Sequence, residues 1–163
     1  MDNDIVFKNS CYGILTELIS AVPCDVADVG VLGVTRYVVL SLLGRVNISS
    51  GQEIVRQRLD DFFARAELLE PTTDEVRFAA ALEFAAHAAD LDLDTGESLL
   101  CAVAAGRLAN SLATGDKRAI AAFENLRDRV SWIANLDGKI LCLEQLIAKL
   151  ITVSEPLKIR EAI

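Results

Sequence analysis

Residues 93–120 read Leu93-Asp-Thr-Gly-Glu-Ser-Leu-Leu-Cys-Ala-Val-Ala-Ala-Gly-Arg-Leu-Ala-Asn-Ser-Leu-Ala-Thr-Gly-Asp-Lys-Arg-Ala-Ile120. An alanine-rich run predicts a helix from Thr95 to Leu108, and the short apolar run Ser111 to Thr114 predicts a strand. A second helix is expected from Lys117 to about Arg129. Helices that alternate with short strands are typical of crossover units on a parallel sheet.

Two acids stand at the starts of these two helices. Glu97 lies in the first turn of one helix, and Asp116 comes directly before the other. In open α/β sheets ligands bind beyond the carboxyl ends of the strands, where carboxylates that meet bind Mg²⁺ or Mn²⁺. Asp94-x-x-Glu97 is also a capping box and Asp116 an N-cap, so spacing alone favours helix capping over a metal site.

The same 28 residues resemble the C-terminal motif region of PIN domains, a family of ribonucleases. In that family an Asp-x-Gly-Glu helix start precedes an alanine-rich helix, a strand and a Thr-x-Asp-x-Arg turn. The resemblance implies an α/β, three-layer fold, with a central parallel sheet of short strands between helices and an added C-terminal helix. It also implies that Glu97 and Asp116 are catalytic acids that bind Mg²⁺ or Mn²⁺, supported by Asp94 and by Thr114, which holds the last loop.

The N-terminal half departs from the family pattern. Where the family has an aspartate after its first strand, this chain offers Asn9, and where it has a glutamate, the chain offers Arg36 or Tyr37. Each exchange removes a negative charge and an oxygen ligand from the expected site. Arg36 or Lys8 would then neutralise the remaining acids directly, which gives an ion-paired cluster without metal.

Short apolar runs and helical periodicity predict the remaining elements. Strands are expected at Asp4–Lys8, at Asp25–Val29 and at residues 68–69. Helices are expected at Cys11–Ala21, Val34–Val46, Ser49–Glu67, Thr73–Ala89 and Gly138–Thr152. Pro23 ends the first helix, and Thr73 is expected to cap the helix that it begins.

Length and composition limit the class of protein. The 163 residues carry a net charge of −8 with 52% hydrophobic residues, which suits one soluble domain, expected over residues 1–153, with a frayed tail at 154–163. No apolar run approaches the 18 residues or so that a membrane span needs, and the acidic start is unlike a signal peptide. We therefore expect a cytoplasmic protein that does not enter a membrane.

Three functional hypotheses follow. The first is a Mg²⁺- or Mn²⁺-dependent ribonuclease, acting on RNA through a partly altered acidic site. The second is an inactive module of the same fold that forms a homodimer, or binds another protein, through the apolar face of Ile140–Leu150. The third is a helical regulator without a parallel sheet, in which the two acids act only as caps.

Overall fold

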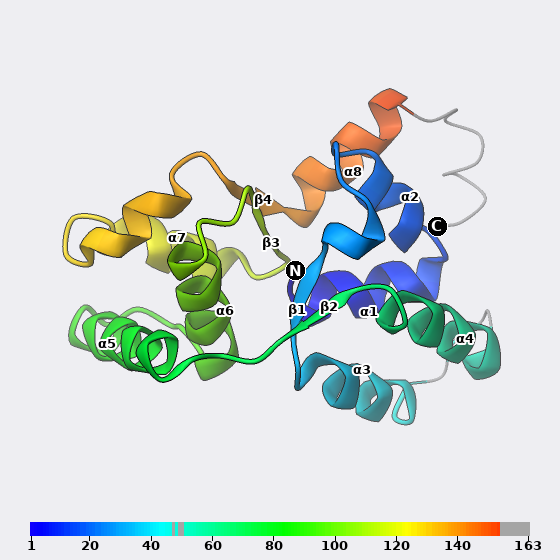
Figure 1. Cartoon of the computed structure of the whole chain (residues 1–163), viewed down its shortest axis with the longest axis horizontal. Coiled ribbons are helices and arrows are strands. Elements are labelled where there is room, and N and C mark those ends of the chain that lie inside the picture. Colours follow the sequence, from blue (N-terminus) through cyan, green and yellow to red (C-terminus); the bar gives the residue numbers. More distant parts are fainter. Residues whose placement is uncertain (47, 49–50, 154–163) are drawn as a thin grey trace. The chain divides into compact units, whose positions relative to one another are not determined.

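The computed structural model describes residues 1–46, 48 and 51–153. The chain divides into two compact units (Figure 1). Unit 1 contains Met1–Leu69 and the described residues from Leu143 on, and unit 2 contains Glu70–Cys142. The expected extent of one domain, residues 1–153, stays a prediction, and the predicted tail at 154–163 lies outside the described residues.

Unit 1 is mostly helical and holds one parallel strand pair in its described part. Its elements are α1 (Asn3–Tyr12), α2 (Leu15–Ser20), the 3₁₀ helix η1 (Val26–Asp28), β1 (Gly30–Leu32), α3 (Thr35–Leu43), α4 (Gln52–Phe63), β2 (Glu67–Leu69) and α8 (Leu143–Val153). Strand β1 pairs with β2 in parallel, and α3 and α4 connect them. The core between these elements is built on Val6, Val31, Val39, Val55 and Leu59.

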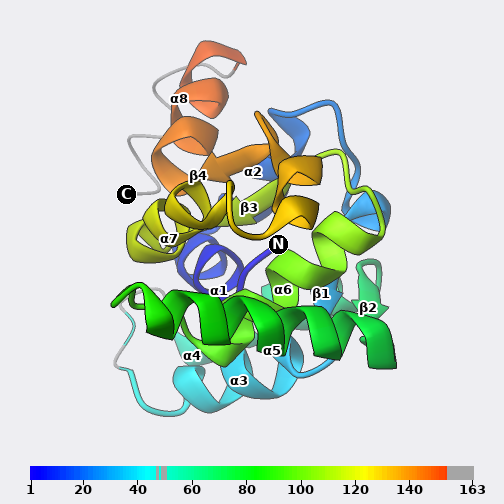
Figure 2. The ribbon, with the colours of Figure 1, turned by 90° about the vertical axis from the view of Figure 1, so that its left-hand side faces the viewer.

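Unit 2 repeats this plan with a second parallel pair. Its elements are α5 (Thr73–Ala88), α6 (Thr95–Gly106), β3 (Leu112–Thr114), α7 (Lys117–Leu126), the 3₁₀ helix η2 (Ser131–Leu136) and β4 (Ile140–Cys142). Strand β3 pairs with β4 in parallel across α7 and η2. Helix α5 packs along α6, and α6 packs against η2 (Figure 2).

These pairs confirm the expectation of an α/β protein with parallel crossovers, and they contradict the helical alternative without a parallel sheet. The described elements are mostly helices, with two separate two-stranded sheets. The finer three-layer arrangement of a PIN domain stays a prediction. Within the described part of the chain, no helix is long and apolar enough to cross a membrane.

The predicted strand Asp4–Lys8 is wrong, because these residues lie in α1. The buried positions are Ile5, Val6, Asn9 and Ser10, a helical repeat in which two polar residues replace the usual apolar ones. Lys8 Nζ pairs with the Asp4 carboxylate one turn away, at 2.6 Å. The polar half of the buried face hides the helical period, and the short run Ile-Val-Phe then looks like a strand.

The second predicted strand is displaced along the chain. Asp25 caps η1 through a capping box with Asp28, so the strand begins only at Gly30. A Cβ at Gly30 would come within 2.6 Å of Leu69 Cδ1 on β2, so a larger residue at this position would displace the Leu69 side chain.

The predicted helix Gly138–Thr152 is correct only in its second part. Residues 140–142 form β4, and α8 begins at Leu143. Leu146 and Leu150 of α8 are buried, and α8 packs against α2. The apolar face is therefore covered only in part within unit 1, and the expected contact with a partner stays a prediction.

An ion pair joins α5 and α6 in unit 2. The Arg107 guanidinium donates from Nε to Glu75 Oε1 at 2.8 Å and from Nη2 to Glu75 Oε2 at 3.1 Å. Glu75 is only 6% exposed, and it also closes a capping box with Thr72, which caps α5 in place of the predicted Thr73. The pair holds the pKa of Glu75 at about 2, chiefly through the hydrogen bond from Arg107.

Removing Arg107 should destabilise unit 2, because Glu75 would keep its charge in a buried place. We expect Arg107→Met to lower the free energy of unfolding by about 2 kcal/mol at pH 7, less than the loss for a fully buried pair, because the Arg107 side chain is 37% exposed. Urea unfolding measures this loss. Arg65→Met, which breaks an exposed pair with Asp25, should cost less than about 1 kcal/mol, and equal losses in the two variants would contradict the role given to Glu75.

Candidate functional site

Asp116 lies where unit 2 passes from β3 into α7. Its Oδ1 accepts hydrogen bonds from the backbone N–H groups of Arg118 at 2.7 Å and Ala119 at 3.4 Å, so the predicted N-cap is present. The backbone N–H of Asp116 donates to the hydroxyl of the buried Thr114, at 3.2 Å. The strand end therefore fixes the direction in which the Asp116 carboxylate points.

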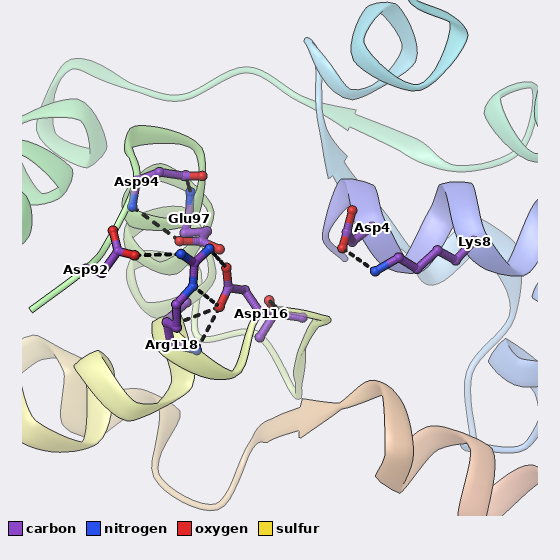
Figure 3. A network of polar contacts seen from close by, with 9 residues as sticks. Asp4, Lys8, Asp92, Asp94, Glu97, Asp116 and Arg118 are labelled. Carbon is purple, nitrogen blue, oxygen red and sulfur yellow. Dashed lines mark hydrogen bonds and ion pairs between the residues drawn. The ribbon is translucent and has the colours of Figure 1, made fainter. Parts of the chain in front are cut away.

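Glu97 approaches Asp116 from the first turn of α6. The capping box with Asp94 is present, since Glu97 N–H donates to Asp94 Oδ1 at 2.9 Å and Asp94 N–H donates to Glu97 Oε2 at 3.2 Å. A side-chain hydrogen bond also joins the carboxyl groups of Glu97 and Asp116. In Figure 3 these two side chains point toward one another from α6 and α7. The two acids that the sequence singles out therefore meet.

The two carboxyl groups differ strongly in acidity. Burial raises the pKa of Glu97 to about 8, and the charges of Asp94 and Asp116 act in the same direction. Hydrogen bonds from Arg118 lower the pKa of Asp116 to about 2. At pH 7 Glu97 is therefore mostly protonated and donates its proton to the Asp116 carboxylate, because two neighbouring carboxylates do not both ionise readily.

Arg118 supplies the positive charge of the cluster. Its Nη2 donates to Asp116 Oδ2 at 2.9 Å, and its Nη1 donates to Asp92 Oδ2 at 2.6 Å (Figure 3). One guanidinium thus bridges two carboxylates from separate segments. The sequence did not predict the roles of Arg118 and Asp92. The Asp-x-Arg spacing of residues 116–118 carried the signal for the pair with Asp116, but no motif marked Asp92.

The fit of a hard divalent ion to this cluster is poor. Mg²⁺ and Mn²⁺ need ionised oxygen ligands with lone pairs directed at the metal. Here the Glu97 carboxyl carries a proton, and both Asp116 oxygens accept hydrogen bonds from Arg118 or the α7 backbone. Among residues 1–46, 48 and 51–153, no group of three Asp, Glu, His or Cys side chains has an arrangement that could hold a metal.

The remaining predicted site residues belong to unit 1, and their side chains are engaged there or exposed. Asn9 was expected after a strand, but it is buried within α1 and donates to the carbonyl oxygen of Ile5 at 2.7 Å. Arg36 pairs with Asp60 at 3.1 Å, and Tyr37 is 80% exposed. Within unit 2 the cation that pairs with Asp116 is Arg118, and the neutralisation of the acids by Arg36 or Lys8 stays a prediction.

Comparison with known proteins found no match to this chain. No family model, no curated protein and no solved structure matches the chain. The resemblance to PIN domains therefore stays a prediction that depends on residues 93–120.

The raised pKa of Glu97 makes stability depend on pH. Because the folded protein holds this proton more tightly than an unfolded chain, whose glutamate titrates near 4.5, the stabilisation is complete below pH 4.5. It is lost as the pH rises through about 8. Glutamine keeps a donor toward Asp116 at every pH, so the free energy of unfolding of Glu97→Gln should match that of the wild type at pH 4, below the value of the unfolded glutamate.

At pH 9 the free energy of unfolding of Glu97→Gln should exceed that of the wild type by roughly 1 kcal/mol, a value reduced for solvent screening. Thermal unfolding between pH 4 and pH 9 measures the difference. Glu124→Gln, at an exposed position on α7, serves as the control and should show no such dependence. If the free energies of unfolding of Glu97→Gln and the wild type differed by the same amount at every pH, the proton would not be shared between Glu97 and Asp116.

Proposed function

We propose that the protein is a PIN-like module that acts through protein–protein contacts and does not cleave RNA. The observation that carries this proposal is the bridge from Arg118 to Asp92 and Asp116, beside a Glu97 carboxyl that keeps its proton. Charge in the cluster is balanced by an arginine and a proton, where a nuclease would use Mg²⁺ or Mn²⁺.

The chemistry open to such a cluster is limited. A general base at pH 7 needs a pKa near that pH and access to the proton that it removes. The Asp116 carboxylate, with a pKa of about 2, is a weak base, and the Glu97 proton is directed at Asp116. The arrangement supports a structural role, in which the cluster ties the start of α7 to the start of α6.

A metal-dependent ribonuclease is the second candidate, because one specific observation favours it. Glu97 and Asp116 do meet, as the resemblance implies for two metal-site acids. A divalent ion at high concentration would compete with the Glu97 proton and with Arg118 for the same oxygens. The two candidates therefore differ in whether Mn²⁺ wins this competition near neutral pH.

Calorimetry and an RNA cleavage assay separate the two candidates. We expect the wild-type protein at pH 7 to leave single-stranded RNA intact in about 5 mM Mn²⁺. In calorimetry it should bind Mn²⁺ too weakly to detect. Arg118→Ala should bind Mn²⁺ measurably, because it releases Asp92 and Asp116. Arg127→Ala, which breaks the ion pair with Asp137 elsewhere in unit 2, is the matched control and should behave as the wild type.

Cleavage by the wild type that Asp116→Asn abolishes would contradict the proposal and favour the ribonuclease. Cleavage that survives in Asp116→Asn would point to a contaminating nuclease and would leave the metal titration to decide. Tight Mn²⁺ binding by the wild type at pH 7 would also contradict the proposal, because the proton and Arg118 would then not hold the acids.

A further inference from the structure

Helix α5 carries an apolar face that is exposed in unit 2. Its opposite face, with Glu75, Ala79, Leu82 and Ala86, is buried. On the exposed face Phe84 is 76% and Val76 51% accessible. Ala80, Ala81 and Ala88 are exposed between and beside them. Figure 2 shows α5 from the side over its whole length. An exposed phenylalanine beside valine and alanines is unusual for a helix surface in water, where such a patch marks a contact.

The exposed face of α5 presents both parts that a knobs-into-holes contact between helices needs, a projecting side chain and a hole that receives one. Phe84 is a single large projecting side chain. About two turns toward the helix start, a hole for one side chain of a facing helix is formed by four residues with the spacing i, i+3, i+4, i+7, which are Thr73, Val76, Arg77 and Ala80. The midpoint between projection and hole falls at Ala80 and Ala81, whose small side chains allow two helix axes to approach closely.

We propose that α5 is a self-association surface, on which the α5 helix of a second copy packs antiparallel about a twofold axis near Ala80. In this arrangement each Phe84 enters the hole of the other copy, so one face makes two identical contacts. The inference rests on the proposed function, to which it adds the partner.

Charge favours a second copy in the antiparallel direction. Each Phe84 ring would lie against Arg77 of the other copy, a cation–π contact. Arg77 pairs with Asp74 on its own helix at 3.3 Å, so the hole itself does not add to the negative charge of the protein. Antiparallel packing also sets the start of each helix dipole beside the end of the other.

The small area of the exposed α5 face limits the expected affinity of the dimer. A helix of 16 residues is about 24 Å long, so the face is smaller than the roughly 800 Å² per partner of a standard interface. We therefore expect a dimer weaker than about 1 μM, which forms over the range from about 10 to 500 μM.

Sedimentation equilibrium of the full chain over this range tests the surface. The wild type should shift from monomer to dimer, and Phe84→Glu should stay monomeric at every concentration, with an unchanged circular dichroism spectrum because position 84 is exposed. Leu108→Glu is the matched control, since Leu108 is another exposed apolar residue of unit 2, at 64%, and it should dimerise as the wild type does. A wild type that is still monomeric at about 500 μM would overturn the inference. A dimer that forms equally well in Phe84→Glu would also overturn it.

A charge-swap pair tests the antiparallel geometry. Ala80 should face Ala80 of the second copy, so Ala80→Glu and Ala80→Lys should each be monomeric alone and should associate when mixed. Failure to associate would overturn the position of the twofold axis. These outcomes are separate from the RNA assay: a monomeric protein that leaves RNA intact overturns only the α5 surface, whereas a dimer that cleaves RNA overturns only the proposed function.

Discussion

The Asp116 carboxylate joins the starts of α6 and α7 in unit 2. It caps α7 through two backbone N–H groups, accepts a hydrogen bond from the Glu97 carboxyl on α6, and pairs with the Arg118 guanidinium. Each of these contacts favours the ionised form, and together they lower the pKa of Asp116 to about 2. One permanently charged carboxylate thus fixes two helix starts and the end of β3.

The charge of Asp116 affects the protonation of Glu97. Beside a carboxylate that does not accept a proton, and partly removed from water, Glu97 keeps its own proton and acts as a donor. Capping and chemistry usually appear as rival explanations for acids at helix starts. Here capping decides the chemistry, because the interactions that satisfy the backbone and Arg118 also take up the oxygens that a metal would need.

The sequence predicted α6, β3, the start of α7 and the acid pair well, because alanine-rich periodicity, the capping box of Asp94 and Glu97, and the N-cap at Asp116 are local signals. It failed where tertiary contacts decide. The polar residues Asn9 and Ser10 are buried in α1 and hide its period, and residues 140–142 form a strand only because β3 lies beside them. The bridge from Arg118 to Asp92 joins residues 26 positions apart, so spacing alone gave no sign of it.

A carbon-13 NMR titration of the Glu97 side-chain carboxyl between pH 3 and pH 10, in protein labelled at glutamate, tests directly whether Glu97 keeps its proton beside Asp116. We expect this carboxyl to titrate with a midpoint near pH 8, far above the value near 4.5 of an ordinary glutamate, and we expect Asp116→Asn to lower this midpoint. A Glu97 midpoint near 4.5 in the wild type would show that the proton is not shared, and it would contradict the central claim.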